Sequence, residues 1–421
     1  MATDFHAAPT SAVYGRNRPA EYNADLQVLR RIRRFLLPKD FAVSAALIDE
    51  LNQGYGLNDA LVDALLADGI KFARPLQRLI LRESGFADNA PTTAQNRADD
   101  QNLLKRAEFA ELYAQFATYP DWYEPQLAEI GAVAYRRYPL MLVWLLRNVA
   151  LMAGYSIPAL ALPLIQTGAL VNDALPRLMR TYAYILAVSE HAAVSPTGRT
   201  ALAIGSEGWR QSIQVRQIHG LVRKQLRHNG WDSTYWGIPI NQTDMVATHL
   251  QFSLLIMRGL KILGARISTE EAEGILHLWR LASWWMGIEL ARLPQYETAA
   301  WAWLYTYLAT QELDFEVGKP LAKALHDLPS QLMGKQTRRG RWVEMVNASV
   351  TRTLVGDDIG DGLGLPRPKW RIGVLASVPI LFGVDTARQF SPQLAIKLEQ
   401  VRAKRQDNMN WWLKRYDHYY Q

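Results

Sequence analysis

The residues STEEAEGILHLWRLASWWMGI (268–288) carry the clearest indication of fold class in this chain. Ser268 stands before a run in which apolar residues recur with a helical period, and Glu271 follows three positions later. This pattern is a capping box, in which the serine hydroxyl and the glutamate carboxylate satisfy free backbone N–H groups at the start of a helix. The stretch therefore predicts a long helix that begins after Ser268.

The same helical period continues along nearly the whole sequence. Asn241, with Asp244 three positions later, predicts the start of another long helix, which stops near Gly264. Alternating strand patterns bounded by turns are absent, so we expect an all-α protein. Further helices are predicted at Asp25–Leu37, Val43–Gln53, Asn58–Asp68, Ala73–Glu83, Asn102–Tyr113, Pro125–Tyr135, Leu140–Ala153, Ala174–His191, Ser206–Arg227, Thr298–Glu312, Lys319–Asp327, Arg341–Leu354 and Pro392–Tyr416.

We expect one large helical domain, because no internal repeat of fixed period is visible. Its parts are an N-terminal helical extension (1–120), a core (121–385) and a C-terminal tail helix (386–421), packed as one compact unit. Residues rich in Gly, Pro, Asn and Asp predict loops at 88–100, 229–243 and 357–368, and we interpret the Gly-rich run from Gly356 to Gly364 as a turn.

Composition indicates enough apolar material for a large core, since 49% of the 421 residues are hydrophobic and 21% are charged. The net charge is +7, with basic clusters at 30–34, 338–341 and 402–405. Because no nucleic-acid-reading motif accompanies these clusters, we expect solvated helix faces and no nucleic-acid partner.

The stretch Asn148–Asn172 carries no charge and is long enough to cross a membrane. Pro158 and Pro163 interrupt it, so we predict two buried helices joined near Tyr155–Pro158 and no transmembrane segment. The N-terminus as written lacks the apolar region of a signal peptide. The mature form of an exported protein would look the same, so the localisation stays open.

Several kinds of chemistry are excluded by what the sequence lacks. There is no cysteine, which excludes thiolate nucleophiles, iron–sulfur clusters and cysteine-ligated metals. None of the eight histidines lies three or four residues from another, and none has glutamate three residues before it. Zinc-protease helices and carboxylate-bridged di-iron bundles are therefore excluded, and a nucleophile elbow and a phosphate loop are missing as well.

The best candidate for chemistry lies on the predicted helix VRQIHGLVRKQL, which starts at Val215. Val215, His219 and Val222 fall on one helical face, and Arg216 and Arg223 flank the histidine by one turn on either side. A haem needs one imidazole on its iron, apolar walls for its ring and cations for its two propionates. A lone histidine beside arginines is more often structural, and the residues alone leave both interpretations open.

A second polar cluster precedes this helix at Arg177, Arg180 and Thr181, which share one face of a predicted helix. Their neighbours are largely apolar. The two arginines could reach solvent and pair with acidic residues elsewhere. The functional alternative is a polar patch that faces an anion, a propionate or bound dioxygen.

Taken together and in this order, these motifs resemble the latex clearing proteins and the wider family of MpaB-type rubber oxygenases. The similarity covers roughly Leu140 to Pro368. It rests on RLMRT (177–181), VRQIHGLVR (215–223), PINQTDM (239–245), the helix after Ser268 and GDGLGLP (360–366).

The resemblance implies a b-type haem in a helical fold whose core is similar to a globin, so that the predicted core (121–385) would be the haem-binding oxygenase. It implies dioxygen-dependent cleavage of carbon–carbon double bonds in poly(cis-1,4-isoprene), which leaves aldehyde and ketone ends. Carried over by position, His219 is the proximal iron ligand, and Arg177 and Thr181 form a polar pair. Arg223 is the arginine one turn past the ligand, and Arg216 on the same helix is a further candidate for cofactor binding.

One departure concerns the distal side of the haem. Where latex clearing proteins have a lysine able to ligate iron, this sequence has Arg180, which stays protonated and is a poor ligand. Arg180 and Thr181 could instead stabilise negative charge that develops on dioxygen. No glutamate stands at 161–170, where a distal base is expected.

Three other functions remain open at this point. The first is a haem oxygenase of the same family that acts on a smaller terpenoid or lipid. The second is a haem-based oxygen binder or sensor without turnover. The third is a helical interaction protein without a cofactor.

Overall fold

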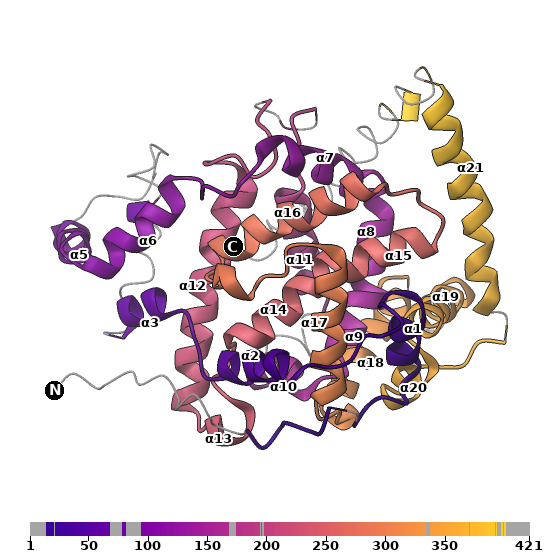
Figure 1. Cartoon of the computed structure of the whole chain (residues 1–421), viewed down its shortest axis with the longest axis horizontal. Coiled ribbons are helices and arrows are strands. Elements are labelled where there is room, and N and C mark those ends of the chain that lie inside the picture. Colours follow the sequence, from indigo (N-terminus) through magenta and orange to yellow (C-terminus); the bar gives the residue numbers. More distant parts are fainter. Residues whose placement is uncertain are drawn as a thin grey trace.

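The computed structural model describes residues 14–20, 22–67, 78–80, 94–167, 174–193, 195, 198–333, 337–369, 371–391, 393, 397–398 and 400. These residues form an all-α protein, as predicted (Figure 1). Extended pairing within them is limited to an isolated bridge between Asn17 and Gln311.

In the first half of the chain the helices are α1 (Gln27–Phe35), α2 (Ala45–Tyr55), α3 (Ala60–Leu66), α5 (Ala94–Leu104), α6 (Ala107–Ala117), α7 (Pro125–Arg136), α8 (Pro139–Leu145), the π-helical turn η2 (Leu146–Leu151), α9 (Met152–Tyr155), α10 (Pro158–Gln166) and α11 (Ala174–Val188). The second half contains α12 (Glu207–His228), α13 (Ser233–Trp236), α14 (Gln242–Leu250), the π-helical turn η3 (Gln251–Leu255), α15 (Ile256–Ile262), α16 (Thr269–Trp285), η4 (Leu290–Arg292), α17 (Glu297–Thr310), α18 (Phe315–Leu332), α19 (Arg338–Leu354), α20 (Asp357–Gly362), η5 (Arg371–Ala376) and α21 (Ser377–Phe390).

The predicted capping signals mark real helix starts. Ser268 Oγ accepts a hydrogen bond from Glu271 N at 3.1 Å, and Glu271 Oε2 accepts one from Ser268 N at 2.9 Å. Asn241 Oδ1 caps α14 by accepting from Asp244 N at 2.8 Å. The helical run from Gln242 ends before Gly264, whose φ of +103° lies in the left-handed region that favours glycine.

The helix α16 crosses the middle of the molecule and packs along α7 (Figure 1). Trp279 and Trp285 on α16 are fully buried. The two helices approach closely because Gly131 faces Gly274, where a Cβ atom on Gly131 would lie 2.1 Å from the Gly274 backbone. The helix α16, whose capping box was the clearest helix signal in the sequence, therefore lies at the centre of the core.

All three of the predicted loops contain helices, and the loop predicted at 229–243 includes the short helix α13. The turn predicted at Gly356–Gly364 includes the short helix α20, because the buried Arg352 donates hydrogen bonds to Asp357 Oδ1 at 3.1 Å and to Asp361 Oδ1 at 2.8 Å. The part of the predicted loop 88–100 that is described is helical in α5.

Other boundaries also differ from prediction. The helix predicted at Asn102–Tyr113 is broken into α5 and α6, and the helix α21 had not been predicted. The helices predicted at Ala73–Glu83 and Pro392–Tyr416, and the basic cluster at 402–405, lie largely or wholly outside the described residues. The division into parts at residues 120 and 385 stays a prediction.

The predicted bend in the uncharged stretch is present, since α9 ends at Tyr155 and α10 starts at Pro158. Within the described residues no single helix is long and apolar enough to span a membrane. The pair Pro139–Tyr155 and Pro158–Gln166 satisfies the length and composition criteria only together, and it is bent by 99°.

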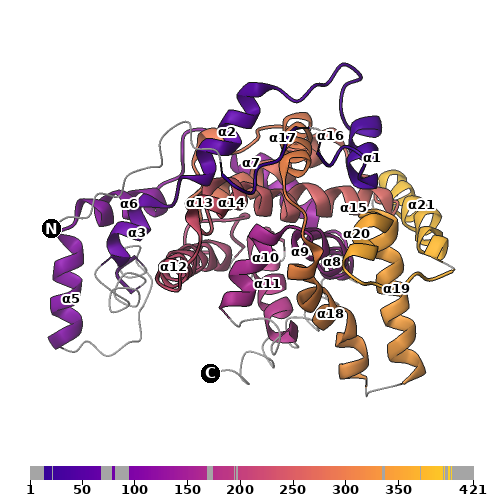
Figure 2. The ribbon, with the colours of Figure 1, turned by 90° about the horizontal axis from the view of Figure 1, so that it is seen from below.

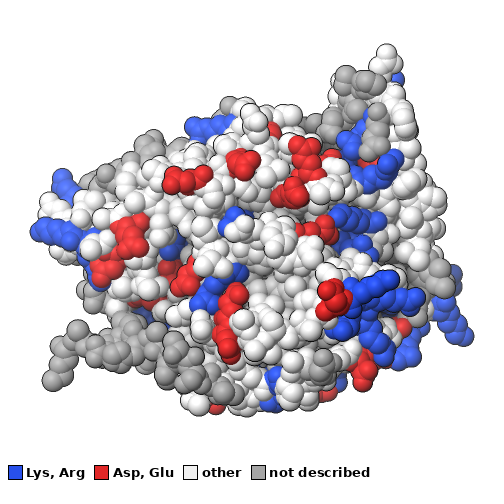
Figure 3. Space-filling view, viewed as in Figure 1, with Lys and Arg blue, Asp and Glu red and all other residues white. Residues whose placement is uncertain are grey.

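The surface charge is distributed unevenly. Figure 3 shows Lys and Arg gathered at the lower right, where Figure 1 places α1 and α20. The arginines of the cluster at 30–34 are exposed on α1, as expected for a solvated helix face.

Candidate functional site

A cavity of about 510 Å³ lies among α9, α10, α11, α12 and α14, and most of its lining is apolar. Figure 2 shows α10, α11 and α12 grouped near the centre of the molecule. Two of the lining residues, Arg180 and Ile218, are exposed, so the cavity opens to solvent beside them. Its size is within the range of about 300–1,000 Å³ that is typical of small-molecule and cofactor sites.

The predicted face of α12 forms one wall of this cavity. Val215, His219 and Val222 line it together with Ile218. The helix begins where Ser206 Oγ accepts a hydrogen bond from Trp209 N at 3.3 Å. The spacing of i, i+4 and i+7 that singled out this face in the sequence therefore places the imidazole at the cavity.

His219 has the properties of an available ligand. Its Nδ1 atom is sealed from solvent and has no hydrogen-bond partner among the described residues. Burial, followed by the positive charge of Arg223, lowers the pKa of His219 to about 4. The ring is therefore neutral at pH 7, and neutral imidazole is the form that binds metal ions.

The two arginines that flank His219 are placed on another side of α12. Arg216 donates to Asp59 Oδ2 at 2.6 Å from Nε and to Asp59 Oδ1 at 2.9 Å from Nη2. Arg223 donates to Asp63 from Nε at 2.8 Å and to the carbonyl of Ile240 at 3.0 Å.

Neither arginine lines the cavity. In this structure Arg223 and Arg216 pair with Asp63 and Asp59 away from the cavity, so contact of Arg223 with a haem propionate and cofactor binding by Arg216 stay predictions. The pairs form because α3 packs on the strip of α12 next to His219 and supplies a carboxylate to each guanidinium.

The polar cluster of α11 lies at the cavity, where Arg177, Arg180 and Thr181 are all lining residues. The structure therefore brings this cluster and His219 to one site. The Arg177 guanidinium makes no hydrogen bond or ion pair with any described residue, and burial lowers its pKa. Thr181 Oγ1 donates to the carbonyl of Arg177 at 3.0 Å, so in this conformation the hydroxyl is free only to accept.

The pairing of Arg177 and Arg180 with acidic residues, which the sequence left open, is not seen within the described part of the chain. Arg180 lies at the opening of the cavity, where it is exposed. Tyr155, which also lines the cavity, lies close enough to Arg177 for their charges to interact, and burial raises the pKa of Tyr155 to about 12. Arg177 is therefore an unneutralised cation in a largely apolar wall.

A second histidine of this cavity was not identified from the sequence. His249 on α14 is buried, its Nδ1 is 2.7 Å from Ser283 Oγ, and its Nε2 is sealed without a partner. Burial lowers its pKa to about 3. The i, i+4, i+7 spacing of Met245, His249 and Phe252, all lining residues, is the signal that could have revealed it.

Asp244 is the sole carboxylate among the described lining residues. Both of its oxygens accept hydrogen bonds from Arg16 at 2.8 Å, and Tyr307 Oη and Asn241 Nδ2 donate to it at 2.8 Å as well. With its lone pairs occupied by four donor contacts, Asp244 fixes the start of α14 and is not available as a base.

Comparison with known proteins gives this site its context. Residues 134–379 match the family model described as the catalytic domain of ER-bound oxygenase mpaB/B'/Rubber oxygenase. The chain belongs to this family. It is an oxygenase family, and Arg177, Arg180, Thr181 and His219 all lie within the matched residues.

Individual relatives cover different shares of the chain. Over 159 residues the chain is 28% identical to a rubber oxygenase from Streptomyces sp. (strain K30), an alignment that covers 37% of this chain and 38% of the relative. The solved structure of a latex clearing protein in the closed state superimposes with a TM-score of 0.58 at 21% identity, over 84% of this chain and 90% of the other. This likeness shows a shared all-α fold.

The cavity fits a haem held by one protein ligand. The neutral imidazole of His219 lines it beside apolar side chains and has an unpaired Nδ1, and Arg177 and Arg180 are cations of the kind that propionates require. Within the described ranges no group of three or more His, Asp or Glu is arranged to hold a metal ion. A single histidine therefore suits a metal ion that a macrocycle already coordinates, as in haem.

Residues outside the match to the family model complete this site. Arg16, Asp59 and Asp63 precede residue 134, and each forms a buried ion pair with a residue of α12 or α14. The N-terminal part of the chain therefore holds two walls of the cavity in place.

Proposed function

We propose that this protein is a haem-dependent dioxygenase that cleaves the double bonds of poly(cis-1,4-isoprene) into oligo-isoprenoids with aldehyde and ketone ends. The observation that carries the proposal is the placement of His219 and the Arg177–Thr181 cluster at one largely apolar cavity. Membership of the oxygenase family and the resemblance to a rubber oxygenase support it.

In this proposal His219 is the protein ligand of haem b, and the bound haem supplies the activation of dioxygen. Arg177 and Arg180 place positive charge on the cavity wall that α11 forms, where it favours propionates or negative charge that develops on oxygen. Thr181 accepts a hydrogen bond, or donates one after turning away from the Arg177 carbonyl. Arg216 and Arg223 hold α12, and with it His219, against α3.

The apolar lining suits an isoprenoid chain. Ile218 is 53% exposed at the opening, so an apolar side chain stands beside the entry. Exclusion of water by such walls strengthens the interaction of the arginines with developing negative charge.

The first test is a visible spectrum of protein expressed with haem supplied. A Soret band at stoichiometric haem is expected, and its absence would remove every haem-based function. The second test incubates the loaded protein with polyisoprene latex or with a short linear isoprenoid and identifies carbonyl products by mass spectrometry. Products from latex are expected. Products from the short isoprenoid alone would indicate a smaller terpenoid or lipid substrate, and neither product nor oxygen uptake would indicate an oxygen binder.

A further inference from the structure

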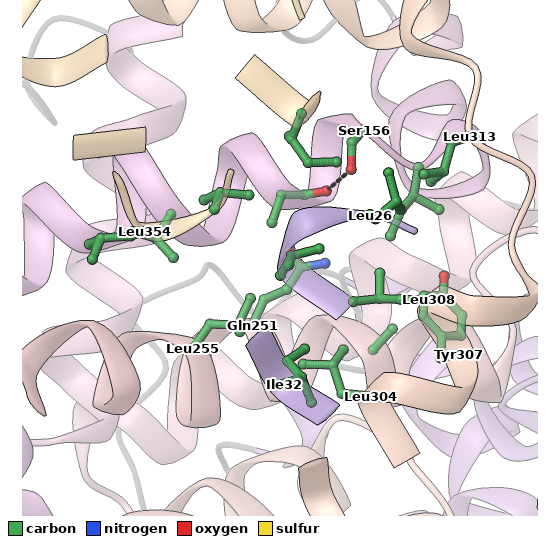
Figure 4. Close-up of a pocket in the computed structure, with 17 residues that line it drawn as sticks. Leu26, Ile32, Ser156, Gln251, Leu255, Leu304, Tyr307, Leu308, Leu313 and Leu354 are labelled. Carbon is green, nitrogen blue, oxygen red and sulfur yellow. Dashed lines mark hydrogen bonds between the residues drawn. The ribbon is translucent and has the colours of Figure 1, made fainter. Parts of the chain in front are cut away.

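A second, much smaller cavity lies next to the proposed haem site. Its volume is about 50 Å³, and it is lined by side chains of α1, η2, α9, α14, η3, α17 and α20 and of the end of α19 (Figure 4). Its lining is almost entirely aliphatic and includes Ile32, Val149, Leu304, Leu308 and Val355.

The polar groups at this cavity offer little to water. Ser156 Oγ donates to the carbonyl of Ala153 at 2.6 Å, a bond drawn in Figure 4, and Tyr307 Oη donates to Asp244 at 2.8 Å. A buried water needs two to four polar partners, and apolar cavities of this kind stay dry and take up apolar molecules such as xenon. Gln251 is the remaining polar residue of the lining.

Gln251 lines both the small cavity and the cavity that contains His219. Its amide lies over Gly154, where a Cβ atom would come within 2.9 Å of Gln251 Oε1. Gly154 lines the large cavity and its neighbour Ala153 lines the small one. The two spaces are therefore separated by the side chain of Gln251, on the π-helical turn η3, a type of turn that is frequent at functional sites.

The size of the small cavity restricts its ligand. A cavity needs a volume of about 10–15 Å³ to hold one water molecule. The small cavity, with a volume of about 50 Å³, therefore has room for a diatomic molecule. We propose that this cavity is a binding site for a small apolar gas, and that dioxygen held there passes Gln251 to reach the proposed haem site. The assignment of dioxygen as the gas rests on the proposed oxygenase function, whereas the apolar gas site itself does not.

The test uses xenon as a probe of the full-length protein, by xenon-pressurised crystallography or ¹²⁹Xe NMR. Xenon is expected between Val149, Leu304 and Val355 and is expected to be lost in Val355→Leu, which fills the cavity. Val350→Leu is the matched control, because Val350 is buried on α19, which Val355 caps, but lines neither cavity. Ala153→Val is a second filling variant in case Val355→Leu does not fold. Absence of xenon from this cavity in the parent protein would overturn the proposal.

The delivery of dioxygen has a separate readout. In haem-loaded protein, Val355→Leu is expected to slow dioxygen association after flash photolysis several-fold, while Val350→Leu leaves the rate unchanged. Equal rates in all three proteins would refute delivery through this cavity. Xenon binding does not require haem. If the protein bound xenon but took up no haem, the proposed gas site would be supported and the proposed oxygenase function would be rejected.

Discussion

Arg216 of α12 and Asp59, the N-cap residue of α3, form a buried ion pair across 157 residues of sequence, with two hydrogen bonds of 2.6 and 2.9 Å and side chains that are each 3% exposed. The pair lies one turn from His219 and fixes the helix that presents the imidazole. It therefore connects the N-terminal helices to the candidate haem site.

The substitution Asp59→Ala is expected to lower the free energy of unfolding by about 3–5 kcal/mol, because it leaves the Arg216 guanidinium buried and unpaired. Chemical denaturation measures this change. Glu207→Ala removes the partner of Arg210 in an exposed pair on the same helix and is expected to cost less than about 1 kcal/mol. If both variants lost a similar free energy of unfolding, burial of the Arg216–Asp59 pair would add nothing to its stabilising effect.

His219→Ala is expected to yield folded protein without stoichiometric haem, because the proposed iron ligand is lost. The ratio of Soret to protein absorbance and a pyridine haemochrome assay measure the haem content. His228→Ala is the matched control, since His228 is exposed on the same helix and does not line the cavity. Equal haem loss in both variants would reject His219 as the ligand.

Arg180→Lys is expected to retain haem and to change the resting absorption spectrum, because a lysine amine can lose its proton and approach iron whereas a guanidinium cannot. The spectrum is recorded between pH 7 and pH 9 beside Arg180→Gln, which removes the charge without adding an amine. If Arg180→Lys and Arg180→Gln give the parent spectrum, residue 180 does not face the iron.

Below pH 6.5 the cofactor-free protein is expected to lose stability through His249. An unfolded histidine binds a proton near pH 6.5, whereas the folded pKa of His249 is about 3, so the unfolded state takes up the proton first. The free energy of unfolding falls by about 1.4 kcal/mol per pH unit in this window, or about 2 kcal/mol between pH 6.5 and pH 5. Denaturation of the parent and of His249→Gln at both pH values isolates this contribution. The same pH dependence in both proteins would contradict it.

Local signals were sufficient for much of the fold. The capping box at Ser268 and Glu271 and the cap at Asn241 were identified correctly because each is formed by residues three apart on one chain segment. The cavity-lining face of α12 was predicted for the same reason, since the helical period alone places Val215, His219 and Val222 on one side. Such local signals are enough to predict the helical class and the imidazole that α12 presents.

Contacts between side chains of different helices could not be predicted in this way. Arg223 was expected at a propionate but pairs with Asp63, and His249 lies at the same cavity as His219 although no sequence pattern associates the two histidines. The short helix α20 depends on contacts of shorter range, since the buried Arg352 binds the acidic residues Asp357 and Asp361 that follow it. Helical period defines the face on which a side chain lies, but the partner of that face depends on packing between segments that are distant in the sequence.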